Sequence, residues 1–419
     1  MTSYAEARDW LFSRRRLGMR YGLDRMTGLL DALGNPQKSF RTIHVVGTNG
    51  KGSTTALLSR TAEELGFVTG RTTSPHLLDY RERIAVDGRW IPTESVTRFV
   101  DGHRGIIEAV EATFFEITTA MAAWHFRETG VEWAVAEAGL GGRLDATRKF
   151  GGECTVFTGV DIEHRRILGS TRSAIAAEKV AIAGPGTILV AARQHHRVEE
   201  AVSRAVETMQ LERAFPLPGG GSALPGEHQV RNAALARAAA RLAFGRREEE
   251  VDSAFTRACR SLRWPGRLDM RRGCPDVLFD VAHNPQSMSR LLEHLGTLGR
   301  RATAVAGFLE DKPWRRMAAM ISSTFDVIVA TTPVSERMLP ASRLKDEFAR
   351  LGVRTTACDS IEDAVAEGRR LAGDLLVVTG SFYVVGEAML ACWRRGWIEP
   401  PEGEEAQVLD SPGGLEPEP

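Results

Sequence analysis

The sequence predicts an α/β protein with an N-terminal phosphate-loop ATPase domain, whose sheet is mostly parallel, and a C-terminal Rossmann-like domain. From about residue 40 to residue 190, short apolar runs alternate with longer helical patterns, which is typical of a parallel sheet covered by helices. A second alternation begins at Val277. Between the first apolar run and the first helical pattern lies a glycine-rich turn. These three observations define the predicted fold class.

In the first half, the strands are predicted at Ile43–Val46, Trp133–Glu137, Cys154–Gly159 and Thr187–Ala191. The intervening helices are predicted near Thr54–Leu65, Ser95–Glu111, Phe115–Thr129 and Thr171–Ile182. In the second half, strands are predicted at Val277–Val281, Ala302–Gly307, Asp326–Thr331, Arg354–Ala357 and Leu375–Thr379. This second set is typical of an independent Rossmann-like domain.

The domain boundary is expected near residue 270, because the segments Trp264–Arg267 and Arg271–Pro275 are rich in turn-forming residues. We therefore predict a first domain over residues 1–270, a second over 271–398, and a tail over 399–419. The tail carries Pro, Glu and Gly with few large apolar residues, so it is expected to be disordered.

Composition excludes several classes of protein. The 54 Lys and Arg residues balance 54 Asp and Glu residues, so the global charge does not favour nucleic acid or an anionic membrane surface as a partner. The five cysteines show no CxxC spacing, which argues against a zinc site or a disulfide framework. No signal-peptide core and no long uncharged apolar run occurs. A cytoplasmic enzyme is expected.

The glycine-rich turn is the most informative segment. It consists of Gly47, Thr48, Asn49, Gly50, Lys51, Gly52 and Ser53. Glycines let backbone N–H groups approach phosphate oxygens, and a helix N-terminus favours an anion. Lys51 would reach the β- and γ-phosphates of ATP, and the Ser53 hydroxyl would hold Mg²⁺. The alternative is a plain glycine turn between a strand and a helix.

Four further segments carry candidate functional side chains. Glu137 ends a predicted strand and precedes a run of glycines, and Asp161, Glu163 and His164 follow the next strand. Lys179 lies on an amphipathic helix, and Asp280 and His283 follow the first strand of the second domain. Ligands bind at such carboxyl ends of parallel strands. Each group also has a plain interpretation: a solvated acid, a loop histidine, or a surface lysine whose stem is buried.

Taken together, these segments resemble the folylpolyglutamate synthase/dihydrofolate synthase family, within the Mur ligase superfamily of ATP-dependent amide-forming ligases. The resemblance covers most of residues 20–390. It rests on Gly22–Arg25, Gly47–Ser53, Thr73–Leu77, Glu82–Ile84, Phe114–Glu116, Glu137–Thr147, His164 with Leu168-Gly169, Glu178-Lys179, Leu224–Gln229, Asn232–Leu235, Trp264–Arg267, Asp280–Pro285 and Val378–Ser381.

The resemblance implies an assignment for each matching position. ATP would be bound by the phosphate loop, Asn232, Arg267 and Asp280. Two Mg²⁺ sites would be formed by Ser53, Ser74, Glu137, His164 and Lys179. Lys179 matches the lysine that the family carries as a carbamate. The acid acceptor would lie near Thr113, Phe114, Leu144, Asp145, Ala146 and Arg148. The incoming amino acid would lie near His283 and Ser381, and Lys51, Lys179 and His283 are the implied catalytic residues.

The implied reaction joins L-glutamate to dihydropteroate or tetrahydrofolate through an acyl phosphate, in a monomeric enzyme. Several positions depart from the family's pattern. Arg148 replaces an Asn, Glu163 replaces an Asp, and Ser170 stands where an Asp is expected. These departures leave open a paralogue that joins an amino acid to a different carboxylic acid. A nucleotide switch that hydrolyses ATP without a carboxylic acid is the alternative from another class.

Overall fold

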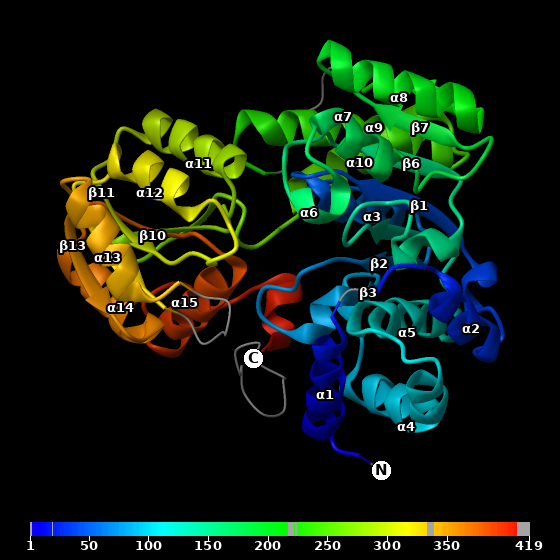
Figure 1. Ribbon diagram of the computed structural model, residues 1–419, viewed down its shortest axis with the longest axis horizontal. Helices are drawn as coiled ribbons and strands as arrows, with labels where there is room; N and C mark the ends of the chain where they lie inside the picture. The colour runs from blue at the N-terminus through cyan, green and yellow to red at the C-terminus, as the bar shows by residue number, and fades with distance from the viewer. Residues whose placement is uncertain (1, 19, 217–221, 223, 333–338, 409–419) are drawn as a thin grey trace. The chain divides into compact units, whose positions relative to one another are not determined.

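The computed structural model describes residues 2–18, 20–216, 222, 224–332 and 339–408, and the chain divides into two compact units (Figure 1). The first unit comprises Met1–Pro75, Tyr80–Ala223 and Glu227–Leu262, and the second comprises His76–Asp79, Leu224–Gly226 and Arg263–Pro419. The second unit thus contains two short segments from the first half of the sequence. Its main part begins before the boundary expected near residue 270.

An eight-stranded sheet forms the centre of the first unit. Its spatial order is β4 (Arg89–Trp90), β3 (Ile84–Val86), β2 (Thr69–Thr72), β5 (Trp133–Glu137), β1 (Arg41–Val46), β6 (Cys154–Phe157), β7 (Ile188–Ala191) and β8 (Glu212–Ala214). Pairing is parallel from β2 to β8, and β3 is antiparallel to both β2 and β4. Because β1 lies between β5 and β6, the carboxyl ends of these three strands meet at one edge.

Helices cover this sheet in three groups. The first group, α1 (Tyr4–Ser13), α2 (Asp24–Ala32), α4 (Thr93–Ala109) and α5 (Phe114–Glu128), contributes to one buried apolar cluster. The second, α7 (Arg172–Val180) and α8 (His196–Met209), packs on β6 and β7 through another. The third, α3 (Lys51–Glu64), α9 (Glu227–Ala243) and α10 (Glu248–Ser261), packs together. Short 3-10 turns are η1 (Arg14–Leu17), η2 (Pro36–Ser39), η3 (Tyr80–Arg83) and η4 (Ala146–Phe150).

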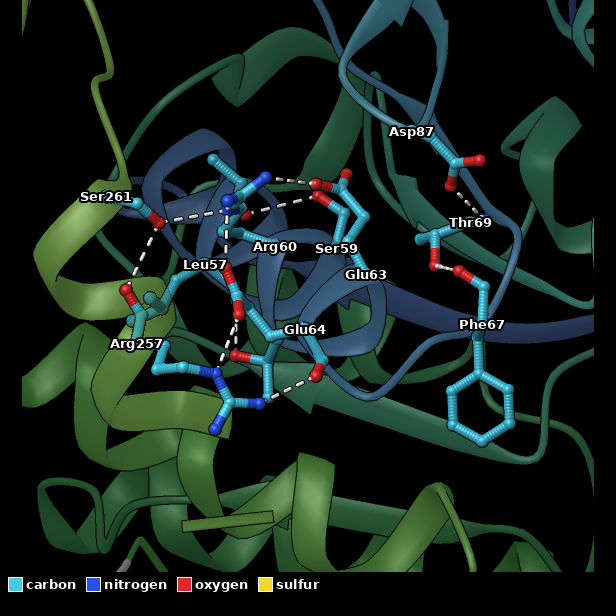
Figure 2. Close-up of polar contacts among 12 residues, drawn as sticks. Leu57, Ser59, Arg60, Glu63, Glu64, Phe67, Thr69, Asp87, Arg257 and Ser261 are labelled. Carbon is cyan, nitrogen blue, oxygen red and sulfur yellow. Dashed lines mark hydrogen bonds and ion pairs between the residues drawn. The ribbon is translucent and has the colours of Figure 1, made fainter. Parts of the chain in front are cut away.

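A network of charged side chains joins the last turns of α3 and α10, as Figure 2 shows. Arg60 donates to Ser261 and pairs with Glu63 and Glu64 at 3.1 and 2.8 Å. Arg257 donates to both the side chain and the backbone carbonyl of Glu64, each at 2.8 Å. The network therefore fixes the C-terminal end of the helix whose N-terminus follows the glycine-rich turn.

The second unit contains a six-stranded sheet. Its order is β13 (Arg354–Cys358), β12 (Val327–Thr331), β11 (Ala302–Ala306), β14 (Leu375–Thr379), β10 (Asp276–Asp280) and β9 (Asp269–Arg271). Only β9, an edge strand, runs antiparallel to its neighbour. The helices are α11 (Pro285–Leu298), α12 (Trp314–Ser322), α13 (Ala341–Arg350), α14 (Ile361–Leu371) and α15 (Phe382–Arg394). On α15, a Cβ atom at Gly386 would lie 2.1 Å from the carbonyl oxygen of Leu77.

Part of the tail expected to be disordered is ordered. Residues Gly403–Val408 form the 3-10 helix η5, in which Glu405 and Val408 are buried. The prediction of disorder rested on the low apolar content of this segment. The segment is instead held by an ion pair between the buried carboxylate of Glu405 and Arg271, which composition does not show. Residues 409–419, the rest of the predicted tail, lie outside the described residues. Over the described part of the chain, no helix is both long and apolar enough to cross a membrane.

Candidate active site

The glycine-rich turn connects the buried strand β1 to helix α3, as the sequence predicts, and α3 begins at Lys51. Two contacts fix it to the segment after β6. The backbone N–H of Thr48 donates to the carbonyl of Gly159 at 3.0 Å, and the hydroxyl of Thr158 donates to the carbonyl of Asn49 at 2.7 Å. The loop is thus held in place from the neighbouring strand, with the N-terminus of a fourteen-residue helix directly behind it.

Helix α9 packs against the glycine-rich turn through Asn232 and Gln229. Gly50 has a φ of +86°, and a Cβ atom there would lie 2.5 Å from Oδ1 of Asn232. One turn earlier on α9, Gln229 donates to the hydroxyl of Ser53 at 3.2 Å and accepts from Asn232 at 2.9 Å. Gln229 was not among the predicted site residues. Its spacing of three from Asn232, which places both on one helix face, is the signal that could have found it.

Glu137 ends β5, and its carboxylate lies next to the loop. Its Oε2 accepts from the backbone N–H of Ser74 at 3.1 Å, and its Oε1 lies 3.9 Å from Nζ of Lys51. Lys51 also donates to the carbonyl of Thr48 at 3.3 Å. The structure therefore brings Lys51, Ser74 and Glu137 together at the carboxyl ends of β1, β2 and β5, where the sequence argument expected ligands.

Lys179 is buried on α7, and its side chain reaches the glycine-rich turn. Its Nζ donates to the carbonyl of Gly47 at 2.9 Å and to Oε1 of Glu163 at 3.1 Å. Burial, reinforced by the charge of Lys51, lowers the pKa of Lys179 to about 8, although Glu163 opposes this shift. The interpretation of Lys179 as a surface lysine is therefore wrong. Glu163, which the sequence placed at the sheet edge without a role, is its partner.

The remaining predicted metal ligand is His164. It is exposed, has a left-handed φ of +46°, and precedes the four-residue helix α6 (Arg165–Leu168). Its role stays a prediction. Among the described residues, no three His, Cys, Asp or Glu side chains are grouped so that they could hold a metal by themselves.

The glycine segment after β5 is organised by Asp145. One carboxylate oxygen accepts from the N–H groups of Gly139 and Leu140, both at 2.9 Å, and the other accepts from the N–H and hydroxyl of Thr147. Burial raises the pKa of Asp145 above its ordinary value, although these four hydrogen bonds oppose the shift. Ala146 is buried beside it. Asp145 therefore holds together the backbone of residues 139–147, the segment near which the acid substrate is predicted to bind.

Two other predicted acceptor residues have local partners of their own. Thr113 caps α5 in a reciprocal arrangement with Glu116. The ring of Phe114 packs against Phe12 and Tyr80, with ring centroids 5.7 and 5.9 Å away. The next residue, Phe115, was not predicted as a site residue. Its ring covers Gly139, where a Cβ atom would lie 2.6 Å from the ring.

Arg148, the unusual residue of this region, is half-buried and donates to the carbonyl of Arg143 at 2.9 Å. Arg143 in turn pairs with Glu178, the neighbour of Lys179, at 3.0 Å. Leu144 is 44 % exposed between them. The guanidinium of Arg148 thus has a backbone partner within the glycine segment.

The predicted residues of the second unit gather at the carboxyl ends of β10 and β14, whose last residues Asp280 and Thr379 are paired. Asp280 accepts from the N–H groups of Leu268 and Ala282, and burial raises its pKa to about 6. The ring of Phe382 lies 5.7 Å from the His283 ring and 4.9 Å from the Arg267 guanidinium. Ser381 caps α15 through the N–H of Val384.

Comparison with known proteins identifies the family. A profile of the Mur ligase glutamate ligase domain matches residues 266–382. The dihydrofolate synthase/folylpolyglutamate synthase of Bacillus subtilis is 31% identical over 425 residues, which cover 92% of this chain and 98% of that protein. The chain belongs to the folylpolyglutamate synthase/dihydrofolate synthase family. The resemblance stated from the sequence is confirmed.

Other members of the folylpolyglutamate synthase/dihydrofolate synthase family show the same relationship. A probable bifunctional folylpolyglutamate synthase/dihydropteroate synthase of Halobacterium salinarum is 33% identical over 434 residues, covering 94% of this chain. This chain spans only about half, 52%, of that protein.

Solved structures of the family have the same fold. Mycobacterium tuberculosis folylpolyglutamate synthase complexed with ADP has a TM-score of 0.84, 30% identity, and covers 95% of this chain and 99% of its own. A bifunctional folylpolyglutamate synthase/dihydrofolate synthase with Mn, AMPPNP and L-glutamate bound has a TM-score of 0.81 and 25% identity. It covers 93% of this chain and 99% of its own. These comparisons do not favour the paralogue alternative.

Proposed function

We propose that this chain is an ATP-dependent ligase that joins L-glutamate to a folate-type acid, dihydropteroate, tetrahydrofolate or both. The observation that carries the proposal is the phosphate loop of a member of this family, with Lys51 3.9 Å from the carboxylate of Glu137. A loop that only connects a strand to a helix would not need a lysine and a buried carboxylate side by side. In the proposal, the cation of Lys51 binds the phosphates of the nucleotide, and the carboxylate of Glu137 binds a metal ion.

ATP binds through its phosphates at the loop. The backbone N–H groups at the start of α3 point toward the loop and favour anionic oxygens. Lys51 supplies a positive charge for the β- and γ-phosphates. Asn232, packed on Gly50, and Arg267 and Asp280 of the second unit are the further nucleotide contacts of the proposal. Relatives with ADP or AMPPNP bound support it.

The donor set fits Mg²⁺. This ion prefers oxygen ligands and keeps several waters, so one or two carboxylates with hydroxyls and substrate phosphates are sufficient. Ser53, Ser74 and Glu137 would hold one ion, and Glu137 with His164 and Lys179 would hold the second. The bound ions would neutralise charge that develops on the transferring phosphoryl group.

Lys179 is proposed to act as a carbamate. The ammonium first gives a proton to water; the neutral amine then attacks carbon dioxide and gives a second proton to water, so a cationic side chain becomes an anionic oxygen ligand. A pKa of about 8 leaves part of the lysine neutral near physiological pH. The adjacent Glu163 carboxylate then requires a cation as its new partner, and a metal ion meets that requirement.

The reaction follows from charge and leaving groups. The carboxylate oxygen of the acid attacks the γ-phosphorus, the bond to the β-phosphate oxygen breaks, and ADP leaves as an acyl phosphate forms. Lys51 stabilises the negative charge on the transferring group. The neutral amino group of glutamate then attacks the acyl carbon, phosphate leaves, and the ammonium proton passes to water. His283 and Ser381 are proposed to hold the incoming glutamate.

The acceptor side is proposed to include Thr113, Phe114, Leu144, Asp145, Ala146 and Arg148. The small-molecule acid, ATP and glutamate are the expected partners. We further propose that the enzyme acts as a monomer in the cytoplasm. The chain's neutral charge balance, with 54 basic and 54 acidic residues, agrees with small substrates rather than nucleic acid.

The test measures ADP release with dihydropteroate, tetrahydrofolate and unrelated acids, each with and without glutamate. A ligase requires both acid and amine, whereas a nucleotide switch releases phosphate without either. Lys51→Ala should abolish most turnover and leave the fold intact, and Lys38→Ala, which removes an exposed lysine, is the control. Turnover near the wild-type level in Lys51→Ala would refute the ATP assignment.

A further inference from the structure

The segment Gly266–Leu268, which carries Arg267, is held in a strained backbone conformation. Leu268 has a φ of +50°, a left-handed conformation that is costly for a residue with a branched side chain. Such a conformation persists only where the surroundings over-determine it. The N–H of Leu268 donates to Asp280, and the carbonyl of Gly266 accepts from the N–H of Val281. Both contacts are made by residues at the carboxyl end of β10.

A second set of restraints comes from the edge strand β9. Asp269 accepts from the N–H of Gly266 at 3.3 Å, and the same carboxylate is bound by both Nε and Nη2 of Arg271 at 2.8 and 3.0 Å. Residues 269 and 271 alternate with Met270 along β9, so their side chains lie on one face of the strand. Arg271 therefore fixes the carboxylate that restrains Gly266.

The C-terminal helix η5 completes this chain of contacts. Glu405 pairs with Nη2 of Arg271, and the side chain of Glu405 is only 4% exposed. Burial opposes the charge of Arg271, but Asp269 and Glu405 together raise its pKa above the ordinary value. One guanidinium thus joins the C-terminal segment to the strained segment. If Glu405 is removed, the mostly buried guanidinium of Arg271 loses one of its two carboxylate partners.

We propose that Glu405 and Arg271 are positioning residues for nucleotide binding, through which the C-terminal segment Gly403–Val408 holds Arg267 and Asp280 in place. This inference rests on the proposed nucleotide contacts of those two residues. It makes η5 part of the ATP-binding framework, although η5 itself need not touch the ligand. Arg271 is suited to the task because its planar fork binds Asp269 through two N–H groups and also reaches Glu405, a fixed geometry that the single ammonium of lysine does not reproduce.

The experiment compares Glu405→Gln, Arg271→Lys and a chain ending at Pro400 with two controls. One control ends at Val408, and the other is Glu362→Gln, which removes an exposed ion pair with Arg395 in the same unit. ADP affinity by calorimetry and KM for ATP and for glutamate are measured on each full-length or shortened enzyme. Hydrogen exchange of the amides over residues 264–270 is followed in parallel.

The three test variants should raise the ADP Kd and the KM for ATP by about two- to thirtyfold, the range typical of residues that couple to a ligand without contacting it. The KM for glutamate should change less, and exchange at residues 264–270 should accelerate. The controls should match the wild type. If a shortened chain does not fold, the two point variants decide the question.

Unchanged ADP affinity and unchanged exchange in folded Glu405→Gln and Arg271→Lys would overturn the inference. A lower melting temperature with unchanged ADP affinity would do the same, because it would show a purely structural role. Failure of the proposed function has a different signature: Lys51→Ala would then leave ATP use intact. The exchange measurement needs no nucleotide, so it reports on the segment in either case.

Discussion

Asn232 packs directly on the backbone of Gly50, so closely that a Cβ atom on Gly50 would lie 2.5 Å from the amide oxygen Oδ1. Gly50 is the N-cap of α3 and Asn232 lies in the second turn of α9, far away in the sequence, and both belong to the first unit. We expect this contact to restrict the shape of the glycine-rich turn. It also provides a matched pair of substitutions.

Gly50→Ala should impair nucleotide use much more than Gly66→Ala. Both glycines have nearly the same left-handed backbone, with φ of +86° and +85°, so each alanine costs about 1–2 kcal/mol of backbone strain. A Cβ at Gly66 meets nothing within 4 Å, whereas one at Gly50 collides with Asn232. The measurement is the KM for ATP and the melting temperature of each variant. Equal KM values would show that the contact does not shape the loop.

Lys179→Ala should lose activity, and small carboxylates or bicarbonate should restore part of it. The variant removes a buried nitrogen that lies 2.9 Å from the carbonyl of Gly47, and small anions can enter the space. Lys179→Arg should remain inactive, because a guanidinium cannot form a carbamate and is not interchangeable with lysine. Turnover is measured with and without added anion. Full activity in Lys179→Arg would mean that the residue acts only as a cation.

Arg148→Asn should raise the KM for the acid acceptor by about tenfold or more, since hydrogen bonds to charged groups contribute about 1.5–3 kcal/mol. The KM for ATP should change little. Lys149→Asn, which removes the neighbouring cation, is the control. Steady-state kinetics with each substrate varied in turn supplies the measurement. An unchanged acceptor KM would leave Arg148 with only its contact to the carbonyl of Arg143.

Acid should destabilise the first unit through His44. Burial lowers the pKa of this strand residue to about 4, below the ordinary value of 6.5, and its Nε2 donates to the carbonyl of Gly151 at 3.1 Å. Between pH 6.5 and pH 4, the imidazole of His44 is therefore protonated in the unfolded chain but mostly neutral in the folded chain. The stabilisation is complete above pH 6.5 and is lost as pH falls toward 4, by about 2 kcal/mol near pH 5.

His44→Gln keeps a donor for Gly151 and removes the titration. Denaturant unfolding of wild type and variant near pH 7.5 and pH 5 should therefore show a smaller loss of unfolding free energy in the variant. His196→Gln, at an exposed position, should behave like the wild type. The same pH dependence in His44→Gln and wild type would refute the assignment.

Much of the fold could be predicted because its central strands are apolar and buried on both faces. β1, β5 and β7 follow apolar runs, and each lies close to its expected bounds. β2 was not predicted, since its sequence is Thr-Gly-Arg-Thr, yet all four residues are buried. Contacts with residues outside the strand, such as that between the N–H of Thr69 and the carboxylate of Asp87, pair some of its polar groups (Figure 2). Those partners lie outside the strand, so a local pattern cannot show them.

The same limit applies to the active site. The proximity of Lys51 and Glu137 could be predicted, because Glu137 ends β5, Lys51 comes shortly after β1, and strand ends of a parallel sheet converge. The role of Gln229 depends on a contact with Ser53 across 176 residues of sequence. Glu163 was recognised as a departure from the family's pattern, but its pairing with Lys179 requires the packing of α7 against β6. The periodicity of apolar residues predicts which face of a helix or strand is buried. It does not predict which distant residue a side chain on that face will contact.

The interleaved composition of the two units has a consequence for how this enzyme can be divided. The family profile covers residues 266–382, but the compact second unit also includes His76–Asp79 and Leu224–Gly226. Expressing residues 263–419 alone would leave α15 without the Leu77 carbonyl that packs on Gly386. A single cut near residue 263 would therefore remove from the second unit two short segments that pack with it. The unit that contains the family match is thus discontinuous in sequence, and an end-to-end fusion that exchanged only the residues after 262 would leave those two segments behind in the first half.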